Sequence, residues 1–322
     1  MTMMTLPRAL LAALLLLGGT FSAQAEWPET TVRWIVPFGP GGANDLVARV
    51  AAEAVSKQIG KPVVIENKPG AGAVIGTDYV AKSRPDGYTF LIGAGGVVVN
   101  SLLSKKLPYA DSDLVPVGMI AVSPSIIAIN PSVPATDLKS FVAWAKSRPG
   151  GTDWATAGRG TTPHFVAEML REASGLNLQI VPYKSGGEGV TAVLQNSVPA
   201  TSEASIVVLP QVRAGNLKAI ASTHGKRMST YPDLATATEQ GFPNIRIGHW
   251  AGLYAPKGTP QPIIERMNAA IQTAMKSPEV KAKLAASDIE TAEGSIEDFA
   301  RYIADERSRL EVYAKSGGMQ QD

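Results

Sequence analysis

Residues 37–49, PFGPGGANDLVAR, are the segment whose residue types and spacing point most directly to chemistry. Gly39, Gly41 and Gly42 let the backbone approach a bound group closely, because glycine has no Cβ. The free N–H groups at the start of the helix that follows favour an anion there. The spacing matches neither G-x-G-x-x-G nor a phosphate loop, since no Lys-Ser/Thr follows the glycines. The pattern therefore favours a carboxylate over a nucleotide, and a tight strand-to-helix turn without a ligand is the alternative.

Three further glycine-rich junctions repeat this design after predicted strands. They are residues 93–96 (GAGG), residues 158–164 (GRGTTPH) and residues 183–187 (YKSGG). In the second junction, Thr161 or Thr162 can cap the following helix or donate a hydroxyl to a ligand. Ligands of open α/β sheets bind outside the carboxyl ends of the strands, where all four loops are expected. The four loops together predict one binding site.

Three ionisable side chains in these loops have two interpretations each. Asp45 lies in a first helical turn, where the helix dipole favours an acid, so it either contacts the ligand or holds the loop. Arg159 either pairs with a ligand carboxylate through both terminal nitrogens or is a solvated loop charge, and its position between two glycines favours the pairing. His164, in the first turn of the next helix, is more typical of a packed or capping residue than of a ligand contact.

The elements that would position these loops alternate between strands and helices. This alternation predicts an α/β fold with mostly parallel sheets and helices on both faces. Apolar periodicity and turn residues such as Gly60 and residues 85–87 (PDG) set the boundaries. We expect strands at residues 31–38, 62–66, 88–92, 125–130, 154–157, 178–182, 217–222 and 250–255. Helices are expected at residues 44–59, 74–84, 137–147, 163–173, 187–195, 260–276, 278–286 and 295–314.

Two such runs followed by a helical stretch predict two lobes with chain crossings between them. We assign residues 26–124 and 248–322 to lobe 1, because the C-terminal helices are expected to return there, and residues 125–247 to lobe 2. The crossings then fall near Pro124 and residues 247–250. Lobes connected in this way close on a ligand by hinge motion.

The first 25 residues predict export. Arg8 precedes the apolar run at residues 9–17, and the segment ends in Ala23-Gln24-Ala25, the A-x-A pattern of a signal-peptide cleavage site. The run is too short for a membrane-spanning helix, although an N-terminal anchor is the alternative. The chain has no cysteine, which excludes lipid attachment at a cleavage-site Cys, disulfides and thiolate metal sites. We therefore expect a free periplasmic protein after cleavage behind Ala25.

Composition and motif content argue against several classes of function. The 30 basic and 28 acidic residues give a net charge of +2, and no basic block marks a nucleic-acid surface. The three histidines, His164, His224 and His249, are in no metal-binding spacing, so no metal is expected. There is no G-x-S-x-G nucleophile elbow. Nothing in the sequence predicts catalysis, and no catalytic residue is assigned.

The chain resembles the Bug family, the solute receptors of tripartite tricarboxylate transporters. The most specific matches are ENKPGAG and PDGYT, at residues 66–72 and 85–89, and they follow the glycine-rich loop in the family's order. The resemblance covers nearly the whole mature chain. Further matching stretches are residues 36–49, 62–93, 105–109, 157–170, 181–187, 214–223, 226–243 and 249–260.

The resemblance implies a two-lobed periplasmic binding protein fold with the ligand cleft between its lobes. It also implies a monomeric receptor without cofactor that captures a small organic carboxylate and delivers it to two membrane permease subunits. In the family the first glycine-rich loop, here residues 38–45, holds a ligand carboxylate, and the loops at residues 158–164 and 183–185 also face the cleft. The ligand-binding candidates are Phe38, Gly41, Gly42, Ala43, Asn44, Asp45, Gly93, Ala94, Gly95, Gly158, Arg159, Thr161, Thr162, His164, Tyr183, Lys184, Ser185 and Glu203.

The chain also departs from the family pattern. Residues 195–199 (QNSVP) replace a Gly-Gly-Gln-Val-Asp-like turn, and Glu203 lies where an Asp is frequent. Arg159 replaces a small or amide residue, which suggests a second carboxylate on the ligand. An aliphatic dicarboxylate, an aromatic dicarboxylate and a tricarboxylate all fit. The alternatives to a transport receptor are a carboxylate sensor for a signalling partner and a periplasmic hydrolase or isomerase.

Overall fold

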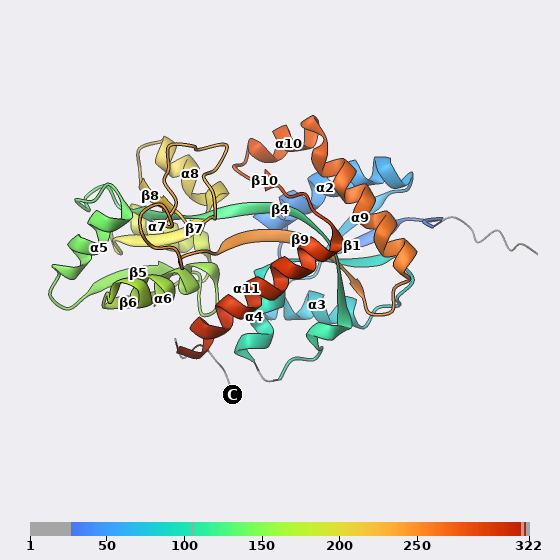
Figure 1. The fold of residues 1–322 in the computed structure, drawn as a ribbon, viewed down its shortest axis with the longest axis horizontal. Helices are drawn as coiled ribbons and strands as arrows, with labels where there is room; N and C mark the ends of the chain where they lie inside the picture. The colour runs from blue at the N-terminus through green and yellow to red at the C-terminus, as the bar shows by residue number, and fades with distance from the viewer. Residues whose placement is uncertain (1–26, 105, 317–318, 320–322) are drawn as a thin grey trace, which may run out of the picture.

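The computed structural model describes residues 27–104, 106–316 and 319, so the predicted signal peptide and its cleavage site lie outside the described residues. The strands form one curled ten-stranded sheet in the order β2-β1-β3-β9-β4-β7-β5-β6, and β8 and β10 pair with β4 off this path. Helices flank the sheet on both sides (Figure 1).

The strands are β1 (Val32–Val36), β2 (Val63–Asn67), β3 (Thr89–Gly93), β4 (Leu114–Ile129), β5 (Thr152–Thr156), β6 (Leu178–Pro182), β7 (Ala200–Ala204), β8 (Lys218–Ser222), β9 (Gly248–Pro256) and β10 (Glu290–Thr291). The α-helices are α2 (Ala43–Ile59), α3 (Val74–Ala81), α4 (Gly95–Leu103), α5 (Leu138–Lys146), α6 (Thr162–Ser174), α7 (Gly186–Leu194), α8 (Ser205–Arg213), α9 (Gln261–Lys276), α10 (Pro278–Ala285) and α11 (Ile296–Ser316), with 3₁₀ turns η1 (Ala71–Ala73) and η2 (Asp111–Asp113).

Strand β4 is 16 residues long and changes partners along its length. Its first part pairs antiparallel with β9, from Leu114 opposite Pro256 to Pro124 opposite Gly248. Beyond Pro124 it pairs antiparallel with β7 and β8 instead. We keep the division into lobes near Pro124 and Gly248 as a proposal, which this exchange of partners supports.

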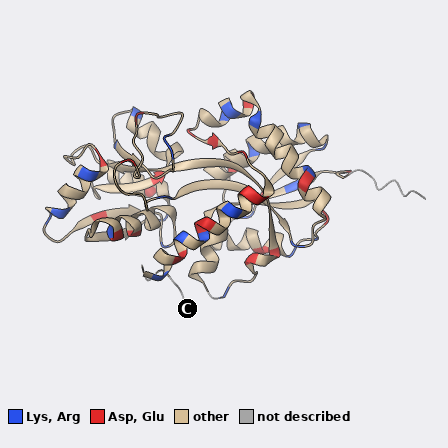
Figure 2. Ribbon diagram, viewed as in Figure 1, with Lys and Arg blue, Asp and Glu red and all other residues tan. Residues whose placement is uncertain are grey.

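Parallel pairing is confined to the two ends of the sheet. Strand β1 is parallel to β2 and β3, and β5 is parallel to β6 and β7, whereas β9 pairs antiparallel with β3 and β4. No charged residue lies on β4 or β9, as Figure 2 shows, because these strands are largely buried. The carboxyl ends of the parallel strands are the places where the predicted loops begin.

Helix α11 packs against both halves of the molecule (Figure 1). Near its start, Phe299 packs edge-on against the rings of Trp250 and Tyr254 on β9. Near its end, Leu310 and Tyr313 belong to the same buried cluster as residues of α5, β5 and α6. The long C-terminal helix therefore connects the middle of the sheet, at β9, with the helices and strand of the α5–β5–α6 cluster.

Most predicted elements are confirmed within a few residues, because clear signals bound them. Helix α2 ends at Gly60, which has a left-handed backbone (φ 70°) and donates its N–H to the Ser56 carbonyl. Helix α5 begins after Asp137, whose carboxylate accepts the Ser140 N–H at 2.7 Å, as predicted. The strand predicted at residues 178–182 is β6 without any change.

Sequence patterns missed the first part of β4, and also α4, β7, α8 and β10. Helix α4 begins with two glycines and continues with three valines, a composition typical of a strand. Helix α8 contains Pro210, which normally ends a helix. Strand β7 reads ATSEA and is buried throughout, so it lacks the apolar alternation on which strand prediction depends.

Candidate functional site

A small pocket lies where the start of α2 meets strands β4 and β9, and we call it the crossing pocket. Ala43 and Asn44 in the first turn of α2 line it, and so do Ser123 on β4 and His249 on β9. Its remaining lining residues are Val47, Ala121, Trp250, Ala251 and Ile289. The pocket thus joins the first predicted glycine-rich loop to the two strands that run between the halves of the sheet.

The loop before α2 is held from inside by Asp45. Only 3% of this residue is exposed, and its carboxylate accepts the Gly41 N–H at 3.0 Å, Arg49 Nε at 2.9 Å and Asn67 Nδ2 at 2.9 Å. The same Asn67 amide donates to the Phe38 carbonyl at 3.0 Å. Burial raises the pKa of Asp45, but the hydrogen bonds from Arg49, the Gly41 N–H and Asn67 outweigh it and hold the pKa at about 2. Asp45 is therefore an anion that shapes the loop.

The first turn of α2 is left open by this arrangement. Gly42 is the N-cap of α2, with an extended backbone, and as a glycine it has no side chain that could cap the helix. Ala43 and Asn44, which begin the helix, face the crossing pocket. Uncapped N–H groups at a helix start, aimed at a pocket, are donors suited to a carboxylate.

The second and third predicted loops are brought together by α4. Gly93 has no room for a Cβ, which would lie 2.4 Å from the Tyr254 ring, so this glycine is required by packing. Ala94 is the N-cap of α4, whose last residue, Leu103, contacts Gly160: a Cβ on Gly160 would lie 2.1 Å from Leu103 Cδ1. The loop at residues 158–164 therefore rests on the end of the helix that begins at the loop of residues 93–95.

The loop at residues 158–164 is closed by its own hydrogen bonds. Thr161 Oγ1 donates to the Gly158 carbonyl at 2.7 Å, and the Gly160 N–H donates to His164 Nδ1 at 3.1 Å. His164 is 8% exposed and its Nε2 lies 3.6 Å from a Glu168 carboxylate oxygen, so it is the packed residue that its sequence position predicted. Arg159 is exposed at the loop tip. Thr162, half-buried, is the first residue of α6.

The fourth loop packs against Glu203, which in turn approaches His249 of the crossing pocket. Ser185 caps α7 by accepting the Glu188 N–H at 3.2 Å, and the half-buried Tyr183 and exposed Lys184 precede it. Glu203, near the carboxyl end of β7, lies against the start of α7. A Cβ on Gly186 would be only 1.9 Å from its Oε2. On the other side, Glu203 Oε1 lies 3.2 Å from His249 Nε2.

The structure therefore assembles part of the predicted set. Ala43 and Asn44 line the crossing pocket, and Glu203 reaches it through His249, whereas the candidates at residues 93–95 and 158–164 are joined to each other through α4. Sequence reasoning considered His249 only as a metal ligand and did not consider Ser123 for the site. The sequence feature that could have identified His249 is its position beside Trp250, in the predicted crossing between the lobes at residues 247–250. Whether each candidate contacts a ligand stays a prediction.

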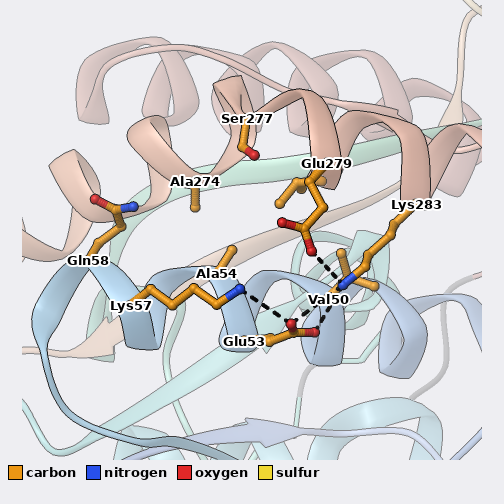
Figure 3. A pocket seen from close by; sticks show the side chains of 10 residues that line it. Val50, Glu53, Ala54, Lys57, Gln58, Ala274, Ser277, Glu279 and Lys283 are labelled. Atoms are coloured by element: carbon orange, nitrogen blue, oxygen red, sulfur yellow. Dashed lines mark hydrogen bonds and ion pairs between the residues drawn. The ribbon is translucent and has the colours of Figure 1, made fainter.

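A second hollow lies on the outer surface, between α2 and α9–α10, and its charges are paired with each other (Figure 3). Lys283 Nζ lies 3.2 Å from Glu53 and 3.0 Å from Glu279, and Lys57 Nζ lies 3.5 Å from Glu53. All four side chains are substantially exposed. This hollow is a contact between helices and contains no residue of the four glycine-rich loops.

No helix among residues 27–104 and 106–316 is both long and apolar enough to cross a membrane. Across the same described ranges, no group of three or more His, Cys, Asp or Glu side chains could hold a metal ion.

Comparison with known proteins gives consistent matches over most of the chain. Residues 47–318 match the family model described as the tripartite tricarboxylate transporter family receptor. The solved structure of the periplasmic binding protein BugD is 31% identical, with a TM-score of 0.77, and the match covers 92% of this chain and 100% of BugD. Rpa4515 of R. palustris, solved with adipate, is 31% identical with a TM-score of 0.81, over 91% and 99% of the two chains. MatC (Rpa3494) of Rhodopseudomonas palustris, solved with bound malate, is 29% identical with a TM-score of 0.76, over 89% and 100%.

Proposed function

The chain belongs to the tripartite tricarboxylate transporter receptor family, and from this premise we propose that it captures a small di- or tricarboxylate and delivers it to two membrane permease subunits. The family membership and the match to BugD confirm the resemblance to Bug receptors, the two-lobed α/β periplasmic binding protein fold and the periplasmic location. The protein is a solute receptor and not an enzyme. We further propose that it acts as a monomer after cleavage behind Ala25.

The open first turn of α2 is the observation that carries the proposed function. Asp45 holds the loop of residues 38–42 in place, and the N–H groups of α2 are left without a side-chain cap at the crossing pocket. A buried carboxylate is stable only where donors satisfy its oxygens, and these N–H groups supply donors together with the favourable end of the helix dipole. The neighbours solved with adipate and with malate support a dicarboxylate as the ligand class.

The test introduces a carboxylate of the protein itself at the first turn of α2. Ala43→Glu places a carboxylate beside the N–H groups that would receive the ligand, so we expect it to abolish dicarboxylate binding. Gln58→Glu is the matched control, because it adds the same charge to an exposed position at the other end of α2. Binding is measured by titration calorimetry and by the ligand-induced rise in melting temperature, which follows from mass action.

Three outcomes would contradict the proposal. If Ala43→Glu folds and binds dicarboxylates as tightly as the wild type, the anion is not held at α2. If no di- or tricarboxylate binds the wild type at millimolar concentration, the ligand class is wrong. A defect in both variants would point to the general charge of α2 and would also count against a site at its first turn.

A further inference from the structure

Glu203, which is buried, and His249, which is half-buried and lines the crossing pocket, form a polar pair. Glu203 is 7% exposed, and its Oε1 accepts the N–H of Ala204 at 2.8 Å. Oε1 also lies 3.2 Å from His249 Nε2. That nitrogen is buried, yet it makes no hydrogen bond of acceptable geometry within the described part of the chain. A buried polar atom without a satisfied hydrogen bond is costly, so it marks a place where another group is expected.

The carboxylate of Glu203 changes what the start of α7 can accept. Its Oε2 lies directly over Gly186, the first residue of α7, where a Cβ would approach it to 1.9 Å. The anion-favouring end of this helix is therefore already faced by a carboxylate of the protein. A ligand carboxylate placed beside it would meet a like charge in a poorly solvated position, which is unfavourable. The two helix starts are thus opposite in character, because α2 offers open donors and α7 is covered by an acceptor.

The pair offers one acceptor and one ring nitrogen that can donate, and the group complementary to both is a hydroxyl. A hydroxyl can donate its proton to Glu203 Oε2 and accept a hydrogen bond from His249 Nε2–H. We propose that the Glu203–His249 pair selects a hydroxyl group on the ligand, so that the receptor takes hydroxy-substituted carboxylic acids in preference to the unsubstituted acids. This inference rests on the proposed function, since a carboxylate held at α2 must place the rest of the ligand beside the pair.

Matched pairs of ligands test the inference on the wild-type protein. The pairs are succinate and malate, glutarate and 2-hydroxyglutarate, and tricarballylate and citrate, with adipate and aspartate added. In any pair that binds, we expect the hydroxy acid to bind about tenfold tighter or more, as measured by titration calorimetry, because a hydrogen bond to a charged group supplies at least that difference. Equal affinities within each binding pair would overturn the inference and leave the carboxylate receptor intact.

The remaining outcomes are also decisive. Binding of adipate without any of the hydroxy acids would overturn the hydroxyl selection alone. Aspartate binding tighter than malate would show that the acceptor receives an ammonium group, and the hydroxyl assignment would be wrong. Failure of every carboxylate would overturn both this inference and the proposed function, so the two failures are distinguishable.

Variants of Glu203 distinguish recognition of the ligand hydroxyl from a purely structural role of this residue. Glu203→Leu removes the acceptor at similar size, so the ratio between the affinities for the hydroxy acid and for the unsubstituted acid should fall to near parity. A purely structural role would instead weaken both acids by the same factor, and that result would overturn the inference. Glu293→Gln, an exposed residue paired with Lys281, is the charge-matched control and should keep the wild-type preference.

A second variant keeps the test decisive if Glu203→Leu does not fold. His249→Ala removes the donor from a side chain that is 27% exposed and is therefore better tolerated. It should reduce the ratio between the affinities for the hydroxy acid and for the unsubstituted acid severalfold. An unchanged ratio between the two affinities would overturn the role of the pair.

Discussion

Replacing Asp45 with asparagine removes the charge that holds the first glycine-rich loop and leaves the size of the side chain almost unchanged. In the wild type, the carboxylate receives hydrogen bonds from the Gly41 N–H, from Arg49 and from Asn67. An asparagine presents an NH₂ group to at least one of these donors, so part of the network is lost. We expect a less stable protein whose loop no longer positions the first turn of α2.

The magnitude follows from the pKa of Asp45, which falls from 3.8 to about 2 on folding. The shift of about 1.8 units corresponds to about 2 kcal/mol, at 1.36 kcal/mol per unit. Because the folded pKa lies below the unfolded value, this stabilisation is fully present above about pH 4. It is lost as the pH falls from 4 towards 2, where the folded protein takes up the proton.

Urea unfolding at pH 7, 5, 4 and 3 measures this stabilisation directly. The free energy of unfolding of Asp45→Asn should lie about 2 kcal/mol below that of the wild type at pH 7, and the difference should shrink below pH 4. Asp233→Asn, at an exposed position, is the control and should follow the wild type. A difference that is the same at every pH, or no difference at pH 7, would refute the assignment of Asp45 as the charged centre of the loop.

Three further predictions concern other contacts. Gly186→Ala forces a Cβ onto the Glu203 carboxylate, so the free energy of unfolding in urea should fall by about 1–3 kcal/mol. The double variant Gly186→Ala/Glu203→Ala should regain most of that loss, and no recovery would contradict the contact. Burial raises the pKa of Glu306 from 4.5 to about 7, so the wild type should lose stability as the pH rises from 4.5 to 7. Glu306→Gln should therefore be more stable than the wild type by about 3 kcal/mol at pH 8 but not at pH 4, and equal stability at pH 8 would contradict the buried charge. Arg213→Ala removes the two 2.6 Å hydrogen bonds that Arg213 donates to the buried Asp288 carboxylate. The free energy of unfolding in the same assay should fall by about 1–3 kcal/mol. An unchanged value would show that this ion pair adds nothing to stability.

Much of the fold could be predicted because its elements carry local signals. Helix α6 begins directly after the GRGT turn (residues 158–161) and is ended by Gly175, which has a left-handed backbone, and both signals are visible in the sequence. The strand β6 is bounded by a loop and by the Tyr183-Lys184-Ser185 turn. In these places the residues next to the element determine its ends, so a local pattern is sufficient.

The missed parts depend on contacts between distant residues. The strand β7 has no apolar periodicity of its own, and it is a strand because β4 and β5 lie on its two sides. Helix α8 contains a proline that a sequence pattern treats as a break. Tertiary packing overrides local propensity in both elements.

In the candidate site, too, some features follow from local sequence and others depend on contacts between distant residues. The glycine-rich loops and the role of Asp45 within its loop follow from local sequence. The structure shows Asp45 holding this loop, and a contact of Asp45 with the ligand stays a prediction. His249 could not be predicted in the same way, because its position depends on the register in which His249 lies opposite Ser123 and on the reach of Glu203 from β7. Long-range register is not encoded in any short segment.

The position of β9 between β3 and β4 determines the order in which the molecule can fold. Leu91 on β3 pairs with Tyr254 on β9, and Met119 on β4 pairs with Gly252, so the sheet around β1 stays incomplete until residues 248–256 are available. Strands β5 to β8 come from one continuous stretch and need only the far part of β4, which precedes them directly. Closing a long loop costs entropy before its contacts form, so the half that contains the N-terminal residues assembles last. The β3 edge of the sheet therefore stays unpaired until residues 248–256, near the end of the chain, take their place.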